Sequence, residues 1–369
     1  MKIVFNTDQI YLHGGIEKVM AEKANYFSEI PGVEVYIITT EQQGKLPCYP
    51  LNKKIKLIDL GVNYNRNKSY FSKENLKKAF IHFKEQRKLF KQLKPDVVIS
   101  ANFNFDHYWL PFVSGKAKVI KERHSSRFYE EKIRKNASFF KRMQFAFSDW
   151  IDSKYTHVVV LNEDEKRYVK SENAVVIPNP ITIPDFSVSL ENKQVLAAGR
   201  IAPVKGFDEL IHIWKLITDE FPDWQLHIYG DDYLNTKSDL KKLIKELDLE
   251  NVIQFKGSVP NLTETMKEYS LYAMTSETEC FPMVLLESLS VGLPVVSYDC
   301  PNGPRNIISN GQDGILAEHK NREAFAEALR KLMKNNSERK EMGIRAKENA
   351  NRFETEEVMK RWLNLIKAQ

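Results

Sequence analysis

Short apolar runs alternate with segments of helical periodicity along the chain, and this alternation limits the folds open to it. Apolar residues fill runs such as 2–6 and 35–38, whereas between them apolar side chains recur at helical spacing, as at Ile16, Val19 and Phe27. Runs that are apolar on both faces are typical of parallel strands covered by helices. The sequence therefore predicts an α/β chain, with further strands at 97–99, 117–120 and 158–161 and a long basic helix from about Ser72 to Lys94.

A polar interruption divides this alternation into two series. Residues 176–180 and the polar stretch to about Lys193 are typical of a linker, which we place at 179–192, and the alternation restarts behind it. With 369 residues the chain is long enough for two domains with sizeable cores. We expect two doubly wound α/β domains, with the binding site in the cleft between the carboxyl ends of their strands. Strands of the second series are expected at 195–198, 225–229, 252–255, 271–274, 294–297 and 314–316, and a terminal helix from about Thr355 to Lys367.

Composition excludes several classes of protein. A hydrophobic content of 42% excludes an intrinsically disordered chain. No apolar run approaches the roughly 18–20 residues that cross a bilayer, and no signal peptide is recognisable. Three cysteines (Cys48, Cys280 and Cys300) without a C-x-x-C pair indicate a reducing cytoplasm and no disulfide or zinc framework. Because the sequence also has no Asp-x-Asp triplet and no metal-spaced histidine pair, we expect a cytoplasmic protein without a metal site.

The net charge of +6 conceals an uneven distribution. Residues 1–180 hold 31 Lys and Arg against 20 Asp and Glu, a balance of +11, which leaves −5 for the rest. Residues 116–142 alone hold ten Lys and Arg, interleaved with Phe128, Tyr129, Phe139 and Phe140. Such a segment is suited to an anionic membrane surface, and a solvated basic helix over a core is the alternative. Nucleic acid is not an expected partner, because no helix-turn-helix, zinc-finger or aromatic RNA-binding pattern occurs.

Two loops that follow predicted strands have residues suited to an anionic ligand. Gly14 and Gly15 lie between the first strand and its helix, where they would let backbone approach an anion, although a tight turn with positive φ explains them equally well. Residues 199–206 follow a buried strand and include Arg200 and Lys205. Two cations at a strand end are suited to a diphosphate; a solvated basic loop is the alternative.

A third loop, residues 279–287, has the most specific pattern. Pro282 fits the first position of a helix, so that Glu279 precedes the helix and Glu287 lies in its second turn. Two carboxylates around a helix N-terminus would accept hydrogen bonds from sugar hydroxyls, while the free N–H groups of the helix face phosphate. The alternative is that Glu287 is a surface residue of the helix.

The run from Ser276 to Pro304, with seven residues between its two glutamates, resembles the signature of retaining glycosyltransferases of family 4. The likeness extends over nearly the whole chain, through residues 14–15, 199–205, 255–259 and 292–296 to the terminal helix with Trp362. It implies the GT-B fold, an α/β fold of two Rossmann-like parallel-sheet domains facing each other across a cleft. It also implies that the last helix returns to the first domain, which gives an acceptor-side domain of 1–178 plus 353–369 and a nucleotide-sugar-binding domain of 193–352.

The resemblance implies a role for each matching residue. Gly14 and Gly15 would lie against the donor phosphates, and backbone near Val259 would meet the base. His124, which alone would be read as a structural histidine, resembles the active-site histidine of the family. The remaining roles would be diphosphate binding by Arg200 and Lys205, sugar binding by Glu279 with backbone at Phe281, Pro282, Met283 and Val284, and ribose binding by Glu287.

The implied reaction is transfer of a hexosyl or N-acetylhexosaminyl group from a nucleoside diphosphate sugar, with UDP-sugar expected, to a saccharide hydroxyl with retention of configuration. No cofactor or metal is expected, since cations and helix N-termini would stabilise the leaving diphosphate. The expected acceptor is a lipid-linked saccharide of a bacterial surface polysaccharide, on the inner face of the plasma membrane. A sugar-nucleotide epimerase, a phosphorylase and a non-catalytic nucleotide-sugar-binding protein are the alternatives.

Two positions depart from the family pattern: Cys280, where glycine is commoner, and Asn306, where glutamate is usual.

Overall fold

The computed structural model describes residues 1–101 and 104–368, which form two compact units. The first unit comprises Met1–Pro178 and Met359–Gln369, and the second comprises Asn179–Val358. Residues 179–192, which we expected to be a linker, and residues 353–358, which we expected in the first domain, both group with the second unit. Within the described residues no helix is both long and apolar enough to cross a bilayer.

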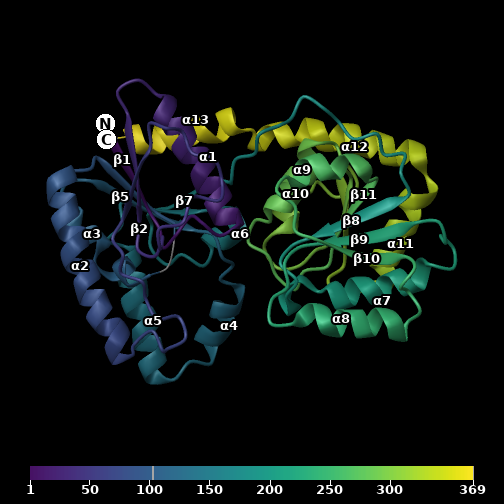
Figure 1. Cartoon of the computed structure of the whole chain (residues 1–369), viewed down its shortest axis with the longest axis horizontal. Coiled ribbons are helices and arrows are strands. Elements are labelled where there is room, and N and C mark those ends of the chain that lie inside the picture. The colour runs from purple at the N-terminus through teal and green to yellow at the C-terminus, as the bar shows by residue number, and fades with distance from the viewer. Residues whose placement is uncertain (102–103, 369) are drawn as a thin grey trace. The chain divides into compact units, whose positions relative to one another are not determined.

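The first unit is built on a parallel sheet of seven strands in the order β3-β2-β1-β4-β5-β6-β7 (Figure 1). Its central strands are buried on both faces, as the apolar runs predicted. The strands are β1 (Lys2–Asn6), β2 (Glu34–Thr39), β3 (Lys56–Asp59), β4 (Val97–Ser100), β5 (Lys118–Arg123), β6 (His157–Val160) and β7 (Ala174–Val176).

Helices cover both faces of this sheet. On one face α1 (Gly15–Glu29) packs through Phe27 against Phe5 of β1, and α13 (Thr355–Lys367) lies beside it, with Trp362 below the Lys23 ammonium of α1. On the other face Phe90 of α2 and Ile151 of α5 belong to the core over β1, β4 and β5. The other elements here are α2 (Lys73–Leu93), η1 (Phe105–Tyr108), α3 (Leu110–Val113), α4 (Phe128–Lys135), α5 (Phe139–Asp152) and α6 (Glu163–Lys166).

The second unit has a parallel six-stranded sheet in the order β10-β9-β8-β11-β12-β13. Its largest core cluster packs α7, α8 and α11 against one face, and α9, α10 and α12 lie over the other (Figure 1). The strands are β8 (Gln194–Ala198), β9 (Gln225–Tyr229), β10 (Ile253–Gly257), β11 (Leu271–Met274), β12 (Val295–Tyr298) and β13 (Gly314–Ala317). The helices are α7 (Phe207–Ile217), α8 (Thr236–Glu246), α9 (Leu262–Thr265), α10 (Met283–Ser290), α11 (Arg322–Lys334) and α12 (Asn336–Ala350), with short turns at η2 (Pro203–Lys205), η3 (Met266–Glu268), η4 (Pro304–Asn306) and η5 (Asn351–Phe353).

All eleven predicted strands are present within a few residues of their expected bounds, and the predicted α/β class is confirmed. Two edge strands were missed. β3 is largely exposed, so it has no apolar run, and β7 is a short strand that ends at Val176, where the linker-like stretch 176–180 begins. Ser72 caps α2 by accepting a hydrogen bond from the backbone N–H of Asn75. The terminal helix α13 begins at Thr355 and ends at Lys367, as expected.

Candidate functional site

In the second unit, the loops singled out in the sequence follow strands of one parallel sheet. Arg200 follows β8, Val259 follows β10, Glu279 follows β11, and all these strands are parallel. Because the carboxyl ends of parallel strands meet at one edge of a sheet, the three loops gather at that edge. The site of this unit is therefore assembled from residues about 80 positions apart in the chain, as parallel topology requires.

A salt bridge joins two of the predicted residues directly. The ammonium Nζ of Lys205, at the end of η2, lies 2.7 Å from the carboxylate Oε1 of Glu279, and both side chains are largely buried. Beneath this pair the hydroxyl of Tyr272 on β11 donates a hydrogen bond of 2.9 Å to the carbonyl of Ala198 on β8. Burial raises the pKa of Tyr272, and the charges of Glu279 and Glu287 raise it further. Both predicted carboxylates therefore lie within electrostatic range of one buried tyrosine.

Glycines in this region permit close backbone approach. Gly206 has φ +62°, and a Cβ there would lie 2.2 Å from the carbonyl oxygen of Thr275. A Cβ on Gly230, after β9, would lie 1.9 Å from the carbonyl oxygen of Gly199. Only glycine fits both the backbone conformation and the space at these positions. The loops that hold Arg200, Lys205 and Glu279 are therefore packed backbone against backbone.

The helix after Glu279 begins one residue later than predicted. Pro282 is the N-cap of α10, not its first helical residue, and it makes no side-chain capping bond. The side chain of Phe281 packs edge-on against Phe353, so that only its backbone is available to a ligand. Met283 and Val284 open the helix, where N–H groups have no intrahelical acceptor. Glu287 lies in the second turn as predicted, but it is buried, so the surface-residue alternative is wrong.

Arg200 has a partner that the sequence did not reveal. Its guanidinium lies 4.5 Å from the ring centre of Tyr233, in the loop after β9, and the side chain is exposed. Within the described part of the chain it forms no salt bridge. The aromatic ring holds the cation at the sheet edge without neutralising it, so Arg200 is available to an anion. The only sequence feature that pointed to Tyr233 was its position after a strand of the second series. Because many loop residues share such a position, this feature could not identify Tyr233.

The two departures from the family pattern leave the local geometry intact. Cys280 is buried and does not have a positive φ, so its backbone conformation is open to any residue. Asn306 ends η4 and donates a side-chain hydrogen bond of 2.6 Å to the carbonyl of Asn302. Gly303 accounts for the close packing here, because a Cβ on it would lie 2.6 Å from Cβ of Glu279.

In the first unit, His124 directly follows β5 and belongs to a buried polar chain. Its Nε2 lies 2.8 Å from the Oε2 of Glu122, whose carboxylate also forms a salt bridge with Lys23 of α1. Burial raises the pKa of Glu122, but the Lys23 ammonium and the hydrogen bond from His124 lower it to about 2. Lys23 lies in turn 4.5 Å from the ring centre of Trp362. A cavity of about 290 Å³ is lined by residues 121–127 with Ile16, Ala101 and Glu130.

The sequence missed Lys23 and Glu122 as site residues. The signal was a lysine on the apolar face of α1, beside Val19, Met20 and Phe27. A buried lysine requires a carboxylate, and the one available lies two residues before His124. Glu122 therefore fixes the orientation of the imidazole.

Gly14 and Gly15 lie at the start of α1, but not for the conformational reason that we considered. Gly14 is the N-cap with φ −160°, an extended conformation, and neither glycine has a positive φ. The positive-φ turn is therefore wrong as an explanation. A Cβ on Gly14 would approach the Oε2 of Glu17 at 2.3 Å, a flexible contact. Gly14 has no side chain to cap the helix, and the carboxylate of Glu17 in the first turn accepts a hydrogen bond from its own backbone N–H. This leaves the N–H groups of Gly15 and Ile16 for an anion.

The basic segment 116–142 is not one surface, contrary to our expectation. Lys121 and Arg123 are strand residues buried in the first unit, and burial lowers the pKa of Lys121 to about 8. Arg123 forms a salt bridge with Asp152, and Lys118 donates to the carbonyl of Ile366 at 2.9 Å. The strand β5 therefore directs Lys121 and Arg123 into the unit. The exposed cations of the segment are Lys116, which precedes β5, and Lys132, Lys135, Lys141 and Arg142 in α4 and α5.

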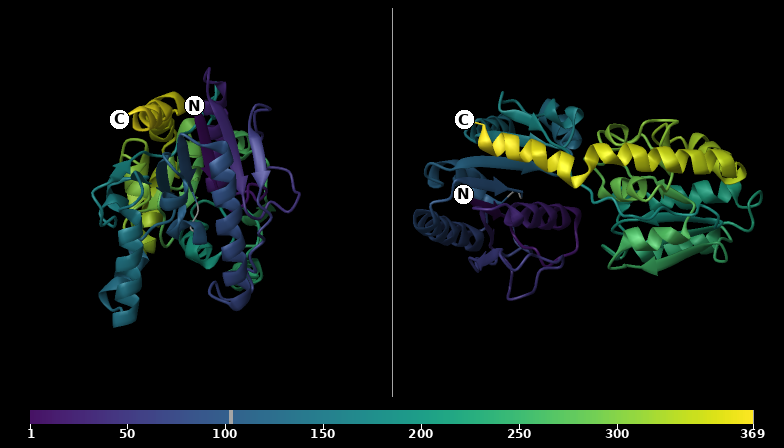
Figure 2. Two further views of the ribbon diagram at one scale, coloured as in Figure 1. Left: turned by 90° about the vertical axis from the view of Figure 1, so that its left-hand side faces the viewer. Right: turned by 90° about the horizontal axis from the view of Figure 1, so that it is seen from above.

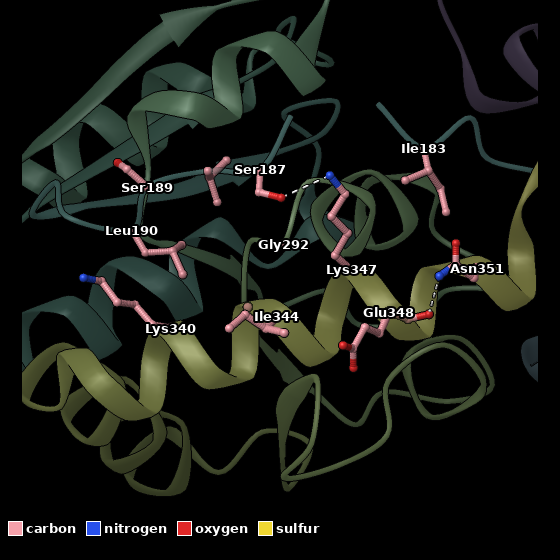
Figure 3. A pocket seen from close by; sticks show the side chains of 12 residues that line it. Ile183, Ser187, Ser189, Leu190, Gly292, Lys340, Ile344, Lys347, Glu348 and Asn351 are labelled. Carbon is pink, nitrogen blue, oxygen red and sulfur yellow. Dashed lines mark hydrogen bonds between the residues drawn. The ribbon is translucent and has the colours of Figure 1, made fainter. Parts of the chain in front are cut away.

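The second unit also has a cavity of about 460 Å³ away from the predicted residues (Figure 3). It lies between residues 183–190 and α12, and the side chains of Ile183, Leu190 and Ile344 make it largely apolar. Lys347 at its edge donates to the carbonyl of Phe186 and to the hydroxyl of Ser187. None of the predicted donor-binding residues lines this cavity, so we assign the functional site to the sheet edge. Nowhere in residues 1–101 and 104–368 do three or more His, Cys, Asp or Glu gather as a metal site would require.

Family models match both halves of the chain. The model described as Glycosyltransferase Family 4 matches residues 13–183, and the model described as Glycosyl transferases group 1 matches residues 182–349. The two parallel-sheet Rossmann-like units agree with the GT-B fold of the structural neighbours. The chain therefore belongs to the glycosyltransferases of the family 4 type, and it is a glycosyltransferase with the GT-B fold.

Individual relatives span the whole chain. An uncharacterized glycosyltransferase of Haemophilus influenzae is 27% identical over 99% of both chains. A Campylobacter jejuni enzyme named GalNAc-α-(1→4)-GalNAc-α-(1→3)-diNAcBac-PP-undecaprenol α-1,4-N-acetyl-D-galactosaminyltransferase is 25% identical over 96% of this chain and 95% of its own. Among solved structures, a variant of S. aureus TarM in complex with fondaparinux, α-GlcNAc-glycerol and UDP is 17% identical with a TM-score of 0.77, and both chains are fully covered. Anabaena HepE in complex with UDP-glucose is likewise 17% identical, with a TM-score of 0.76 over both whole chains.

Proposed function

We propose that this glycosyltransferase moves a hexosyl or N-acetylhexosaminyl group from a UDP-sugar to a hydroxyl of a lipid-linked saccharide, with retention of configuration and without a metal ion. The observation that carries the proposal is the salt bridge between Lys205 and Glu279, with the exposed Arg200 at the same sheet edge. Two cations for a diphosphate and one carboxylate for sugar hydroxyls are the groups that a nucleotide sugar requires. Structural neighbours that bind UDP and sugars support the same class of donor.

The chemical task is to stabilise the departing diphosphate while a cationic, oxocarbenium-like sugar forms. Arg200 and Lys205 would hold the diphosphate, and the free N–H groups of Met283 and Val284 at the start of α10 would add partial positive charge. These fixed charges stabilise the leaving group without a metal. Glu279 would accept hydrogen bonds from sugar hydroxyls, and its negative charge would also favour the cationic sugar.

The remaining donor contacts follow from the places of the predicted residues. Glu287, in the second turn of α10, would bind the ribose, and backbone near Val259 would meet the base. In the first unit, Gly14 and Gly15 would present the open N–H groups of α1 to the phosphates. His124, oriented by Glu122, would lie against the donor sugar.

Retention requires that the acceptor attack from the face that the diphosphate leaves. We favour direct same-face attack, with the leaving phosphate accepting the proton of the acceptor hydroxyl. The bond between the anomeric carbon and the phosphate oxygen breaks, and the bond to the acceptor oxygen forms. Glu279 is engaged by Lys205 and would be held as a hydrogen-bond acceptor for sugar hydroxyls, which makes it a poor covalent nucleophile.

The acceptor class rests on a relative. The Campylobacter jejuni enzyme, whose name includes a diphosphate-undecaprenol saccharide, matches this chain over almost its entire length. We extend that acceptor class, a saccharide on a lipid diphosphate, to this protein, which would then act in the synthesis of a bacterial surface polysaccharide at the inner face of the membrane.

The test is release of free nucleoside diphosphate from a panel of UDP-glucose, UDP-galactose, UDP-N-acetylglucosamine and GDP-mannose, with and without a lipid-diphosphate saccharide. We expect turnover that requires the acceptor and is greatest with one UDP-sugar. The anomeric configuration of the product, measured by NMR, should equal that of the donor. Epimerised nucleotide sugar, phosphate-dependent turnover or tight UDP binding without turnover would instead indicate an epimerase, a phosphorylase or a binding protein, respectively.

A further inference from the structure

The helices α4 and α5 of the first unit form a hairpin that is little buried. No residue of α4 is buried, and in α5 only Ile151 and Asp152, in its last turn, are buried. The two helices extend from the sheet of this unit (Figures 1 and 2). A helix that covers a core buries an apolar stripe along its whole length, so covering the core does not account for these sequences.

The exposed apolar side chains of α5 lie on one side of the helix. At about 100° per residue, five of them fall within an arc of about 100°. At the start of α5, Phe139 is 70% exposed and Phe140 is 81% exposed. Phe147 and Trp150 stack on each other with ring centres 5.8 Å apart and continue the stripe. The docking stripe is defined here by Phe139, Phe140, Met143, Phe147 and Trp150.

Among the described residues, the charged side chains around the stripe that form no salt bridge are all positive. Every acidic residue from 128 to 154 is engaged in a salt bridge: Glu130 and Asp149 with Arg134, Glu131 with Lys170, and Asp152 with Arg123. The exposed cations of the hairpin form no salt bridge with any described residue, and Lys154 lies over the ring of Trp150 at 5.1 Å. These exposed cations are Lys132, Lys135, Lys141, Arg142 and Lys154.

We infer that the docking stripe and these five cations bind the interface of an anionic lipid bilayer. The aromatic and apolar side chains would enter the boundary between headgroups and acyl chains, where aromatic residues are favoured. The cations would lie at the level of the lipid phosphates, each contributing to the attraction. A second copy of the chain is a poorer occupant, because a two-fold contact would bring these five cations against the same five cations.

This surface would bring the first unit to a lipid-linked substrate, a role that rests on the proposed function. It also replaces the broader segment 116–142, since the cations of β5 are buried. Binding to vesicles is measured without donor or acceptor. Failure of the docking surface is therefore distinguishable from failure of the proposed reaction.

The test is co-sedimentation of the full chain with vesicles of phosphatidylcholine alone or with phosphatidylglycerol added, in low salt. We expect recovery with the anionic vesicles only. The double variant Phe139→Ser/Phe140→Ser should bind them at least about tenfold more weakly, because it removes the apolar area at the tip of the stripe. The triple variant Lys135→Glu/Lys141→Glu/Arg142→Glu should bind at least about 100-fold more weakly, because each lost cation costs roughly fivefold and each new carboxylate is repelled by the anionic surface.

The matched control is Phe80→Ser/Ile81→Ser on α2, which removes two exposed apolar side chains from another basic helix of the same unit. It should bind as the unsubstituted protein does. Equal recovery on neutral and anionic vesicles, or an equal loss in the α2 control, would overturn the inference. So would a protein that is dimeric without lipid, by light scattering, and becomes monomeric in the Phe139/Phe140 variant, because the stripe would then be a contact between copies.

Discussion

The ammonium of Lys205 and the carboxylate of Glu279 lie 2.7 Å apart, although 74 residues separate them in the chain. The pair joins the loop after β8 to the loop after β11 and holds both side chains at the sheet edge. When a nucleotide sugar binds, we expect the ammonium to exchange its carboxylate partner for phosphate oxygens. Glu279 would then turn its acceptor oxygens to the sugar.

Glu279→Gln should separate sugar recognition from diphosphate recognition. The loss of the carboxylate lowers kcat/KM for the sugar nucleotide by about 100-fold, because a fixed negative charge beside the developing sugar cation is removed. Binding of UDP itself, measured by calorimetry, should stay within about threefold or become tighter, since Lys205 is released from its partner. Glu264→Gln, which alters an exposed salt bridge with Lys267 in the same unit, should change neither. UDP binding that falls in parallel with kcat/KM would contradict this division of roles.

Gly206→Ala should destabilise the second unit more than Gly257→Ala does. Gly206 and Gly257 both have positive φ, at +62° and +77°, so alanine costs about 1–2 kcal/mol at either position. At Gly206 the new Cβ also meets the carbonyl of Thr275, and this overpacking adds about 1–3 kcal/mol, whereas at Gly257 no atom lies within 4 Å. The free energy of unfolding, measured with urea, checks the difference. Equal losses at the two positions would show that the loop around Lys205 is less tightly packed than described.

Lys23→Met should destabilise the first unit in a pH-dependent way. Lys23 holds the pKa of the buried Glu122 well below its ordinary value, so the pair stabilises the fold above about pH 4.5 and this contribution is lost as the pH falls toward 2. Without Lys23, Glu122 is a buried charge without its main partner, at a cost of about 3–5 kcal/mol at pH 7.5. The loss should be smaller at pH 5, where Glu122 in the variant is more readily protonated.

The double variant Lys23→Met/Glu122→Gln provides the matched comparison. It should recover part of the stability at pH 7.5, because the unpaired charge is gone. Urea unfolding at both pH values measures the effect. A loss for Lys23→Met that is the same at both pH values and is not reduced in the double variant would mean that the lysine acts through packing on Trp362 alone.

The sequence predicted the fold well because central parallel strands are buried on both faces and therefore appear as apolar runs. The strands that it missed lie at the sheet edges, and β3, whose sequence is Lys-Leu-Ile-Asp, is largely exposed and has only two apolar residues. The start of α10 was predicted one residue too early, at Pro282, because a proline suits the N-cap as well as the first helical position.

The candidate site was predicted less completely. Arg200, Lys205 and Glu279 could be assigned to one sheet edge, because each follows a strand, but their contacts depend on how loops from different strands pack. Tyr233 and Lys23 were missed for this reason, as their partners lie far away in the chain. The buried cations of β5 were misjudged because a charge count does not show which face of a strand a lysine occupies.

The central claim is that Arg200 and Lys205 stabilise the leaving diphosphate of a nucleotide sugar. The most direct test is kcat of Arg200→Ala/Lys205→Ala with saturating donor and acceptor, beside Lys242→Ala, whose exposed salt bridge with Asp239 lies in the same unit. We predict a loss of about 1000-fold or more for the double variant, since removal of a single preorganised donor typically costs about 100–1000-fold, and no change for the control. A double variant that retains kcat within about tenfold of the unsubstituted protein would contradict the account.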